Sequence, residues 1–438
     1  MSVNQNIKPL TMEVKENLCI GGCDTVELLK QYGSPLYVID EVTLRTVCRE
    51  YKQAFSSYPN SQILYAAKAL ATSAIFKILA DEGLGFDVVS GGELYTAYKS
   101  GVDMSTVLFN GNNKQEWELE TAIDVGVGLI SVDNFYEIEL LSQIAQKRNK
   151  SVNILLRITP GIDCHTHEYI QTGQLDSKFG FDLSQIDDAI CAIKKCDKLC
   201  LKGMHAHIGS QIFDDAGFKD EVRILVAELA RIKAQHGLEL TEINIGGGLG
   251  VKYVETDTPP EIATVAKNVI EVLEAAKKEY GISDLKIYVE PGRSIVSTAG
   301  VTLYTVGATK QVPNATKYVS VDGGMADNIR PAMYQAEYVC DVANKMNEEK
   351  TEKVTIAGRY CESGDILIND ITLPKLEPND VICVYNTGAY NYSMASNYNR
   401  TQKIAMVLVN NSQSDIIVYR ETLDDLISHD SIPDRLRK

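Results

Sequence analysis

The sequence contains a glycine-rich turn, GGGLGV at residues 246–251, directly after the apolar run EINI. Glycine lets backbone N–H groups point at a phosphate without a Cβ in the way. Many such turns bind nothing, so the motif alone leaves three alternatives: a nucleotide site, another phosphate site, or a tight turn. The spacing is G-G-G-x-G rather than G-x-G-x-x-G, and the motif does not open an early strand–helix–strand unit, which argues against a dinucleotide.

A lysine, Lys68, stands at the end of another apolar run, LYAAKAL. Burying a lysine there is costly unless it is used, although a side chain that reaches the surface from a strand end stays an alternative. A buried lysine with a lowered pKa can attack an aldehyde and form a Schiff base. A phosphate site, such a lysine and an acid such as Glu290, which would keep a pyridine nitrogen protonated, together indicate pyridoxal phosphate.

Eight apolar runs between about residues 60 and 290 alternate with stretches that can be helical. The runs are QILYAAK, GFDVVS, TVLFN, GLISV, NILLRI, GMHAHI, EINIG and KIYVE. Two helices are clear from their apolar stripes: residues 215–236, ended by Gly237, and residues 259–280, ended by Gly281. Eight strand–helix units predict a TIM-type (β/α)₈ barrel, with an open doubly wound sheet as the alternative.

Three motifs follow neighbouring strands of the predicted barrel. HIGS (residues 207–210) ends the sixth run, GGGLG follows the seventh, and EPGR (residues 290–293) ends the eighth. Active sites of such barrels lie at the carboxyl ends of the strands, and phosphate sites favour the loops after strands 7 and 8. The barrel therefore favours a phosphate site over an empty turn. The long polar segment 161–181 is predicted to be a loop over this face plus a helix.

After residue 300 the pattern changes to short β runs separated by turn residues, with little helix between them. We therefore predict that residues 41–295 form a pyridoxal-phosphate-binding barrel and residues 296–438 form a C-terminal all-β domain. Residues 1–40 are predicted to join the β domain through the run SPLYVID (residues 34–40). The acidic tail from Glu421 is predicted to be a helix or a solvated segment.

The bulk composition excludes several classes of partner. The 438 residues are 45% hydrophobic and 23% charged, and 43 basic against 59 acidic residues give a net charge of −16. This balance argues against nucleic acid or an anionic membrane as the main partner. There is no signal-peptide core or long apolar run, so we expect a cytoplasmic protein. The ten cysteines are too sparse for a disulfide scaffold, and no metal site is expected.

The motifs resemble those of the alanine-racemase-fold (fold type III) pyridoxal-phosphate decarboxylases, and within them the diaminopimelate decarboxylases most closely. The resemblance extends from about Pro35 to about Asn410. It rests on YAAKA, FDVVSGGEL, GMHAHIGSQ, INIGGGLGV, EPGRSIV, VDGGMADNIRPAMY, CESGD and GAYNYSMASNYN, in the family's order. It implies decarboxylation of meso-2,6-diaminopimelate to L-lysine and carbon dioxide, the last step of lysine biosynthesis. It also implies a homodimer, and the sequence leaves open whether dimers pair further into tetramers.

The resemblance also assigns roles to single residues. Lys68 would carry the cofactor, His207 would stack on its ring, and Glu290 would pair with the pyridinium nitrogen. The cofactor-binding residues it implies are Lys68, His207, Ser210, Gly246, Gly247, Gly248, Glu290, Gly292, Arg293 and Tyr390. Cys361 and Glu362 would arrive from the second subunit, and Cys361 would return the proton to the substrate Cα.

Substrate choice must lie at the far end of the substrate, where diaminopimelate carries a carboxylate and an ammonium. A guanidinium suits the first and an acid the second. Arg330 is favoured for the carboxylate, although an arginine at this position could instead form an ion pair at the surface without a role in binding. The candidates for substrate binding are Arg293, Arg330, Tyr334, Glu362 and Tyr390. Two residues depart from the family pattern: Leu70 stands where asparagine is usual, and Asn391 where glycine is usual. Asn391 was expected to fit because asparagine tolerates glycine-like backbone angles.

Two other functions stay open from the sequence. One is a polyamine-pathway decarboxylase of the same fold, acting on carboxynorspermidine, ornithine, lysine or arginine. The other is a catalytically inactive homologue with a binding role, which the presence of both Lys68 and Cys361 disfavours.

Overall fold

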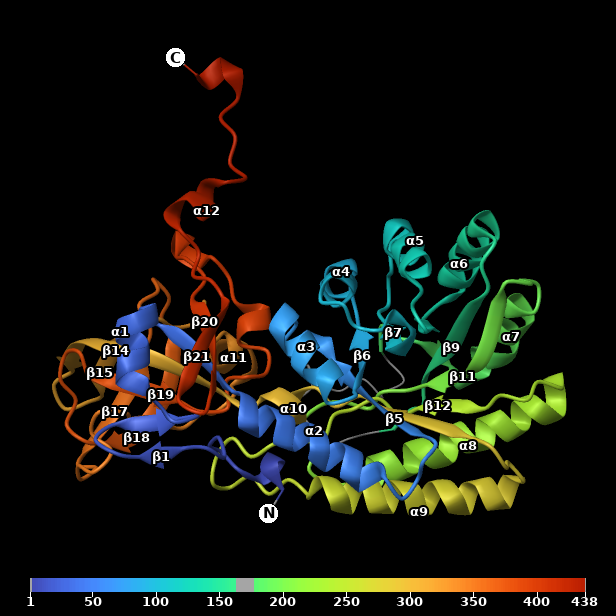
Figure 1. The fold of residues 1–438 in the computed structure, drawn as a ribbon, viewed down its shortest axis with the longest axis horizontal. Helices are drawn as coiled ribbons and strands as arrows, with labels where there is room; N and C mark the ends of the chain where they lie inside the picture. The colour runs from blue at the N-terminus through green and yellow to red at the C-terminus, as the bar shows by residue number, and fades with distance from the viewer. Residues whose placement is uncertain (1, 163–176, 438) are drawn as a thin grey trace. The chain divides into compact units, whose positions relative to one another are not determined.

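The computed structural model describes residues 2–162 and 177–437, and the chain divides into two compact units (Figure 1). The barrel unit comprises the residues up to Asn6, Arg45–Lys252 and Thr256–Val296. The β unit comprises Ile7–Leu44, Tyr253–Glu255 and the chain from Ser297 on. Most of the predicted loop and helix at residues 161–181 falls on positions 163–176, which lie outside the described residues.

Eight parallel strands of the barrel unit close on themselves. They are β5 (Ser61–Ala66), β6 (Gly85–Val88), β7 (Val107–Phe109), β8 (Leu129–Val132), β9 (Val152–Thr159), β11 (Leu199–His205), β12 (Glu242–Asn244) and β13 (Lys286–Val289). β13 pairs with β5 and β8 pairs with β9, both in parallel, so no edge stays open among the eight. This confirms the predicted (β/α)₈ barrel and excludes the open sheet. β10 (Phe181–Asp182) adds a short pairing to β9.

Helices alternate with these strands along the chain (Figure 1). They are α2 (Glu41–Phe55), α3 (Ser73–Asp81), α4 (Gly91–Lys99), α5 (Glu116–Val125), α6 (Phe135–Arg148), α7 (Ile186–Ile193), α8 (Ala216–His236), α9 (Ile262–Tyr280) and the short α10 (Arg293–Val296). α8 and α9 end at Gly237 and Gly281 as predicted, both with left-handed backbone angles that glycine adopts without strain.

The β unit is built on a sheet with the order β18-β17-β15-β14-β4-β20-β21, with β19 and β16 pairing off β14. The strands are β4 (Leu36–Asp40), β14 (Gly300–Gln311), β15 (Lys317–Val321), β16 (Cys340–Val342), β17 (Glu352–Ala357), β18 (Ile366–Leu373), β19 (Val381–Val384), β20 (Ala405–Asn410) and β21 (Gln413–Val418). The predicted strand at residues 34–40 is β4, which joins this sheet between β14 and β20. Its five residues are all buried.

Shorter elements complete the β unit. A three-stranded sheet of β1 (Glu13–Val14), β2 (Leu18–Ile20) and β3 (Cys23–Asp24) precedes α1 (Thr25–Tyr32), while α11 (Arg330–Tyr334) and the exposed α12 (Leu423–Ile427) lie further along the chain. Across residues 2–162 and 177–437, no helix combines the length and the apolar character needed to cross a membrane.

Candidate active site

The glycine turn is hydrogen-bonded to both neighbouring motifs of the barrel rim. The Glu290 N–H donates to the Gly246 carbonyl at 2.6 Å, and the Ile212 N–H donates to the Gly248 carbonyl at 2.9 Å. The Gly247 N–H donates to His207 Nδ1 at 3.3 Å. HIGS, GGGLG and EPGR therefore lie side by side, as the order of the strands requires.

Close packing explains why glycines occupy this turn. A Cβ on Gly247 would lie 2.0 Å from the Glu290 carbonyl oxygen, and a Cβ on Gly248 would lie 2.2 Å from that of Gly209. Gly248 also has a φ of 117°, which other residues rarely adopt. The backbone of the turn is thus pressed against its neighbours with no room for side chains.

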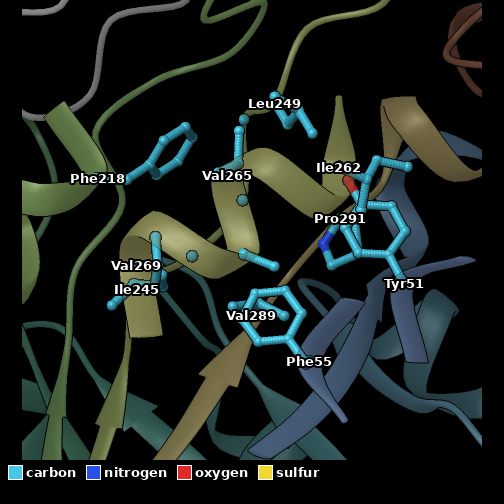
Figure 2. A pocket seen from close by; sticks show the side chains of 14 residues that line it. Tyr51, Phe55, Phe218, Ile245, Leu249, Ile262, Val265, Val269, Val289 and Pro291 are labelled. Carbon is cyan, nitrogen blue, oxygen red and sulfur yellow. The ribbon is translucent and has the colours of Figure 1, made fainter. Parts of the chain in front are cut away.

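An apolar cavity of about 40 Å³ lies next to the glycine turn, which forms part of its lining (Figure 2). Phe218, Val265 and Val269 line it from helices α8 and α9, and Tyr51 and Phe55 line it from α2. The space holds no more than a few water molecules, so it is far too small for a cofactor. It belongs to the packing that seats the turn against the helices.

A hydroxyl and a guanidinium accompany the turn. Arg293, which begins α10, donates from Nε and Nη2 to Ser210 Oγ at 3.4 and 3.1 Å. Its side chain is buried, at 5% exposure. Gly292 brings this segment close to the end of β5, because a Cβ there would lie 3.0 Å from that of Ala66. Backbone N–H groups, a hydroxyl and a buried cation in one place suit an anion such as a phosphate.

Glu290 is buried between polar side chains from the ends of two adjacent strands. Asn244 Nδ2 donates to Glu290 Oε1 at 2.6 Å, and His205 Nε2 lies 3.4 Å from Oε2. The other ring nitrogen of His205 is 2.9 Å from Ser131 Oγ. These contacts hold the carboxylate of Glu290 in one orientation inside the barrel.

Two buried carboxyl groups of this site have pKa values that are shifted in opposite directions. Burial opposes the charge of Glu290, but the His205 imidazole and the Asn244 amide outweigh it and lower the pKa of Glu290 below its ordinary value. Burial and the neighbouring Glu290 raise the pKa of Asp87 well above its usual range. Glu290 therefore favours its ionised form more than an ordinary glutamate does, whereas Asp87 holds its proton more tightly than an ordinary aspartate. An ionised carboxylate is what a protonated pyridine nitrogen needs as its partner.

Lys68 is placed differently from the expectation. It lies in the 3₁₀ turn Ala67–Ala69 that follows β5, and its side chain is exposed, whereas Ala67, Ala69 and Leu70 are fully buried. The prediction of a buried lysine was wrong, because the turn directs the side chain away from the core. Burial raises the pKa of Asp87 and of Glu93 and opposes the charge of Glu290, and the charge of Lys68 acts against burial at all three carboxyl groups. The amine of Lys68 is thus accessible to a ligand, and acidic side chains surround it.

His207 supplies a neutral aromatic ring. It is half-buried, and burial together with the charges of Lys68 and Arg157 lowers its pKa well below the usual value. Since the Gly247 N–H points at Nδ1, that nitrogen accepts and the ring proton belongs on Nε2. An uncharged imidazole can stack on another flat ring.

These residues together fit pyridoxal phosphate. The glycine turn with Ser210 suits the phosphate, the Glu290 carboxylate suits the pyridinium nitrogen, and the reachable amine of Lys68 suits the aldehyde. The fit rests on a close-packed turn and on an oriented, ionised acid, neither of which an idle strand–helix turn requires.

Gly247→Ala is expected to weaken binding of pyridoxal phosphate by roughly 5- to 150-fold, the equivalent of a 1–3 kcal/mol overpacking strain. The new Cβ would displace the Glu290 backbone from the turn. Titration of the apoenzyme with the cofactor, followed by absorbance, measures this. The control is Gly92→Ala on α4, where a Cβ meets only Ser90 Oγ at 3.8 Å. Equal affinities for both variants would contradict the role of the turn.

In the β unit, Arg330 stands in a cage of tyrosines at the start of α11. Its guanidinium carbon lies 5.2 Å from the ring centre of Tyr334 and 5.3 Å from that of Tyr390. The side chain is 7% exposed, so the alternative of a surface ion pair does not hold. Within the described ranges, no carboxylate is recorded within ion-pair distance of it. Burial opposes the charge, but Tyr338, Tyr253 and Tyr390 raise the pKa of Arg330 above its ordinary value.

The backbone beside this cage shows how Asn391 fits. Tyr390 has a φ of 68°, whereas Asn391 has φ −60° and ψ −61°, ordinary helical values. Asn391 therefore fits this turn with ordinary backbone angles, and the tolerance of asparagine for glycine-like angles is not needed here. The strained position is Tyr390, and Asn391 is fully buried.

Cys361 and Glu362 lie on an exposed loop of the β unit. The Cys361 N–H donates to Asn399 Oδ1 at 3.1 Å, and the Tyr398 hydroxyl donates to Glu362 Oε1. Asp365 ties the loop down, accepting from the Tyr360 N–H at 2.8 Å and from the Met325 N–H at 2.6 Å. The loop is therefore fixed by neighbours while both functional side chains stay exposed.

Several residues of these sites escaped prediction from the sequence. His205 is two positions before His207 in the run GMHAHI, which the sequence already marked as a strand, and this spacing was a usable signal. Asn244 is a buried polar residue at the end of β12, between Ile243 and Ile245, which is a second signal. Nothing in the local sequence indicates Asp87, Tyr398 or Asn399, because their contacts come from segments distant along the chain.

Comparison with known proteins identifies what this chain is similar to. Residues 44–297 match the family model described as pyridoxal-dependent decarboxylase, pyridoxal binding domain. A diaminopimelate decarboxylase of Synechocystis sp. is 50% identical over 448 aligned residues, covering 99% of this chain and 95% of that protein. One from Halalkalibacterium halodurans is 46% identical, covering 95% of both.

A solved structure agrees over the whole chain. The crystal structure of diaminopimelate decarboxylase from M. jannaschii in complex with L-lysine superposes with a TM-score of 0.92 at 36% identity, covering 100% of both chains.

Proposed function

This chain belongs to the diaminopimelate decarboxylase family, and from that premise we propose how its own residues divide the work of the reaction. The family identity, the barrel fold and the predicted cofactor are confirmed. The protein is a pyridoxal-phosphate-dependent carboxy-lyase that converts meso-2,6-diaminopimelate to L-lysine and carbon dioxide, as the sequence predicted. The single-residue roles are our proposal.

When bound, pyridoxal phosphate supplies an electron sink for the charge that remains on the substrate Cα after carbon dioxide leaves. Lys68 would hold its aldehyde, and Glu290 would keep the proton on its pyridine nitrogen. Ser210, Arg293 and the glycine turn would hold its phosphate, and His207 would lie against the ring. The ionised state of Glu290 and the packed turn support these assignments.

Arg330 binds the distal carboxylate of the substrate. The observation that carries this is a buried guanidinium caged by neutral tyrosines, with no carboxylate recorded as its partner in the part of the chain that the structure describes. A buried cation of this kind is costly unless an anion reaches it. Tyr334 and Tyr390 line the same place, while Glu362 receives the distal ammonium.

Cys361 returns the proton to the Cα, acting from the partner subunit of a homodimer. The exposure of the Cys361 loop supports this proposal. A thiol that transfers a proton to the Cα has to be shielded from water, and in an exposed loop another subunit would provide that shielding. The contacts with Asn399 and Tyr398 hold Cys361 and Glu362 ready for such a partner. A cytoplasmic location stays a prediction of the sequence.

Mixing Lys68→Ala protein with Cys361→Ala protein tests the shared site. If the partner supplies Cys361, each inactive homodimer lacks one group, but a mixed dimer has one intact site. Activity is expected to recover to roughly a quarter of the parent's, because random exchange makes half of the dimers mixed with one active site each. Recovery of lysine formation after subunit exchange is the measurement. Two inactive variants that stay inactive after verified exchange would contradict the shared site.

The substrate assignment is tested by supplying the purified protein and pyridoxal phosphate with five candidates in parallel. These are meso-diaminopimelate, ornithine, arginine, lysine and carboxynorspermidine. Turnover of diaminopimelate alone is expected, since it alone pairs a distal carboxylate with a distal ammonium. Turnover of another substrate instead would refute the role given to Arg330 and Glu362. Inactivity with all five would favour the inactive homologue.

A further inference from the structure

Glu290 receives a polar contact at each of its carboxylate oxygens, from two different strands. Asn244 Nδ2, at the end of β12, donates to Oε1 at 2.6 Å, and His205 Nε2, at the end of β11, lies 3.4 Å from Oε2. All three residues are buried. A buried carboxylate without donors is costly, so these two side chains stabilise the charge of Glu290 inside the barrel.

The Asn244 amide has one orientation that suits both of its neighbours. Its Oδ1 accepts from the Gly246 N–H at 2.8 Å. Since an amide oxygen accepts and an amide nitrogen donates, this contact leaves Nδ2 directed at Glu290. The glycine turn therefore fixes the donor on one side of the carboxylate.

His205 can serve the other side only if its ring carries a proton on Nε2. Burial lowers the pKa of His205 below its ordinary value, so the ring is uncharged at neutral pH and has a single proton. The distance from Nε2 to Glu290 is long for a hydrogen bond, and Nε2 makes no closer one among the residues that the structure describes. With the proton on Nδ1 instead, the lone pair of Nε2 would face the carboxylate and repel it.

Ser131 favours the tautomer of His205 that Glu290 needs. Ser131 is fully buried on β8, and its Oγ lies 2.9 Å from His205 Nδ1. Within residues 2–162 and 177–437, this hydroxyl has no other hydrogen-bond partner. If it accepted from Nδ1, its own proton would be buried without an acceptor, whereas donating to Nδ1 leaves no donor unpaired. The hydroxyl therefore donates to Nδ1, and the ring proton lies on Nε2, facing Glu290.

We propose that Ser131, His205 and Asn244 are positioning residues for the cofactor: Ser131 sets the tautomer of His205, and His205 with Asn244 supplies the donors that keep the Glu290 carboxylate charged and in one orientation for the pyridine nitrogen. This inference rests on the proposed role of Glu290. The three residues act through Glu290 and are not assigned any contact with the cofactor itself.

Ser131→Ala and His205→Asn test this relay through the affinity of the apoenzyme for two forms of the cofactor, titrated by absorbance. The probes are pyridoxal phosphate and its 1-deaza analogue, in which a C–H group that cannot be protonated replaces the pyridine nitrogen. Pyridoxal phosphate is expected to bind roughly 3- to 10-fold more weakly to Ser131→Ala, the range for a neutral hydrogen bond, and roughly 12- to 150-fold more weakly to His205→Asn, the range for one to a charge. The analogue should lose less than about twofold in both, because it makes no charged pair with Glu290. His205→Gln, whose longer side chain can place an N–H near the position of Nε2, should bind pyridoxal phosphate more tightly than His205→Asn.

Nuclear magnetic resonance of the parent holoenzyme checks the tautomer independently of these affinities. The ¹⁵N shifts of a neutral imidazole distinguish a proton on Nε2 from one on Nδ1. The resonances of His205 among the six histidines are identified by their loss in His205→Asn. A proton on Nε2 is expected, and a proton on Nδ1 or a charged ring would overturn the role given to Ser131.

The control is Ser142→Ala, at a buried serine of α6, which should leave both affinities unchanged. An equal loss for both cofactor forms in Ser131→Ala would overturn the relay, because it would report general damage, and so would no loss for either form. Glu290→Gln separates this inference from the proposed function, since it should weaken pyridoxal phosphate and spare the analogue. If Glu290→Gln showed no such selectivity, the proposed role of Glu290 would fall. A selective effect of Glu290→Gln beside silent Ser131→Ala and His205→Asn would overturn the relay alone.

Discussion

Lys68→Ala is expected to lower lysine formation on the order of 10⁴-fold or more, the scale seen when an essential catalytic group is removed. The proposed covalent hold on the cofactor depends on this amine, which no other group at the end of β5 can replace. The side chain is exposed and its neighbours form the core, so the fold should be retained with stability changed by no more than about 0.5 kcal/mol. Release of carbon dioxide and lysine measures the first effect, and thermal melting the second.

The matched variants separate the amine from its charge. Lys68→Arg keeps a cation beside Asp87 and Glu93 but cannot attack an aldehyde, so it should be as inactive as Lys68→Ala. Lys77→Ala, at an exposed lysine of α3, should leave activity unchanged. Normal turnover by Lys68→Ala would refute covalent attachment. Normal turnover by Lys68→Arg would show that the charge alone matters.

Arg330→Ala should lower kcat/KM for diaminopimelate by roughly 30- to 4000-fold, the equivalent of the 2–5 kcal/mol that loss of one partner from a buried charge pair costs. The substrate carboxylate would then be buried without a cation. Pyridoxal phosphate should stay bound, because Arg330 is assigned to the substrate and not to the cofactor. Steady-state kinetics with diaminopimelate and absorbance of the bound cofactor measure the two expectations.

Two further variants sharpen this result. Arg330→Lys keeps the charge but loses the two-pronged geometry, so its kcat/KM should lie between those of the parent and Arg330→Ala. Arg223→Ala removes an arginine of α8 that pairs with Asp220 at the surface, and it should have no effect. Unchanged turnover by Arg330→Ala, or loss of the cofactor in both Arg330 variants, would contradict the substrate role.

The strands that the sequence missed have a physical explanation. β16 has only three residues, too few for an alternation of apolar and polar positions to be recognised. β18 has the sequence ILINDITL, whose apolar alternation breaks at Asn369 and Asp370. Asp370 has a φ of 53°, and the pairing of β17 with β18 shifts register around it. A bulge of this kind disguises a strand as a turn.

The sequence by itself determined the barrel and the order of the motifs on its rim. Regular apolar runs and glycine-terminated helices are local features, and a closed parallel barrel brings the ends of all its strands to one rim. HIGS, GGGLG and EPGR could therefore be placed next to each other before any contact was known. The glycine turn is ambiguous as an isolated motif, and its position on the rim of the barrel favours a phosphate site.

Tertiary structure alone decided the environment of each group. The exposure of Lys68, the opposite pKa shifts of Glu290 and Asp87, and the cage around Arg330 all depend on side chains far apart in the chain. Burial and electrostatics arise from what surrounds a group in three dimensions, and the pattern of neighbouring residues in one dimension does not contain them. The residues that could react could therefore be predicted from the sequence, whereas their protonation and their orientation could not.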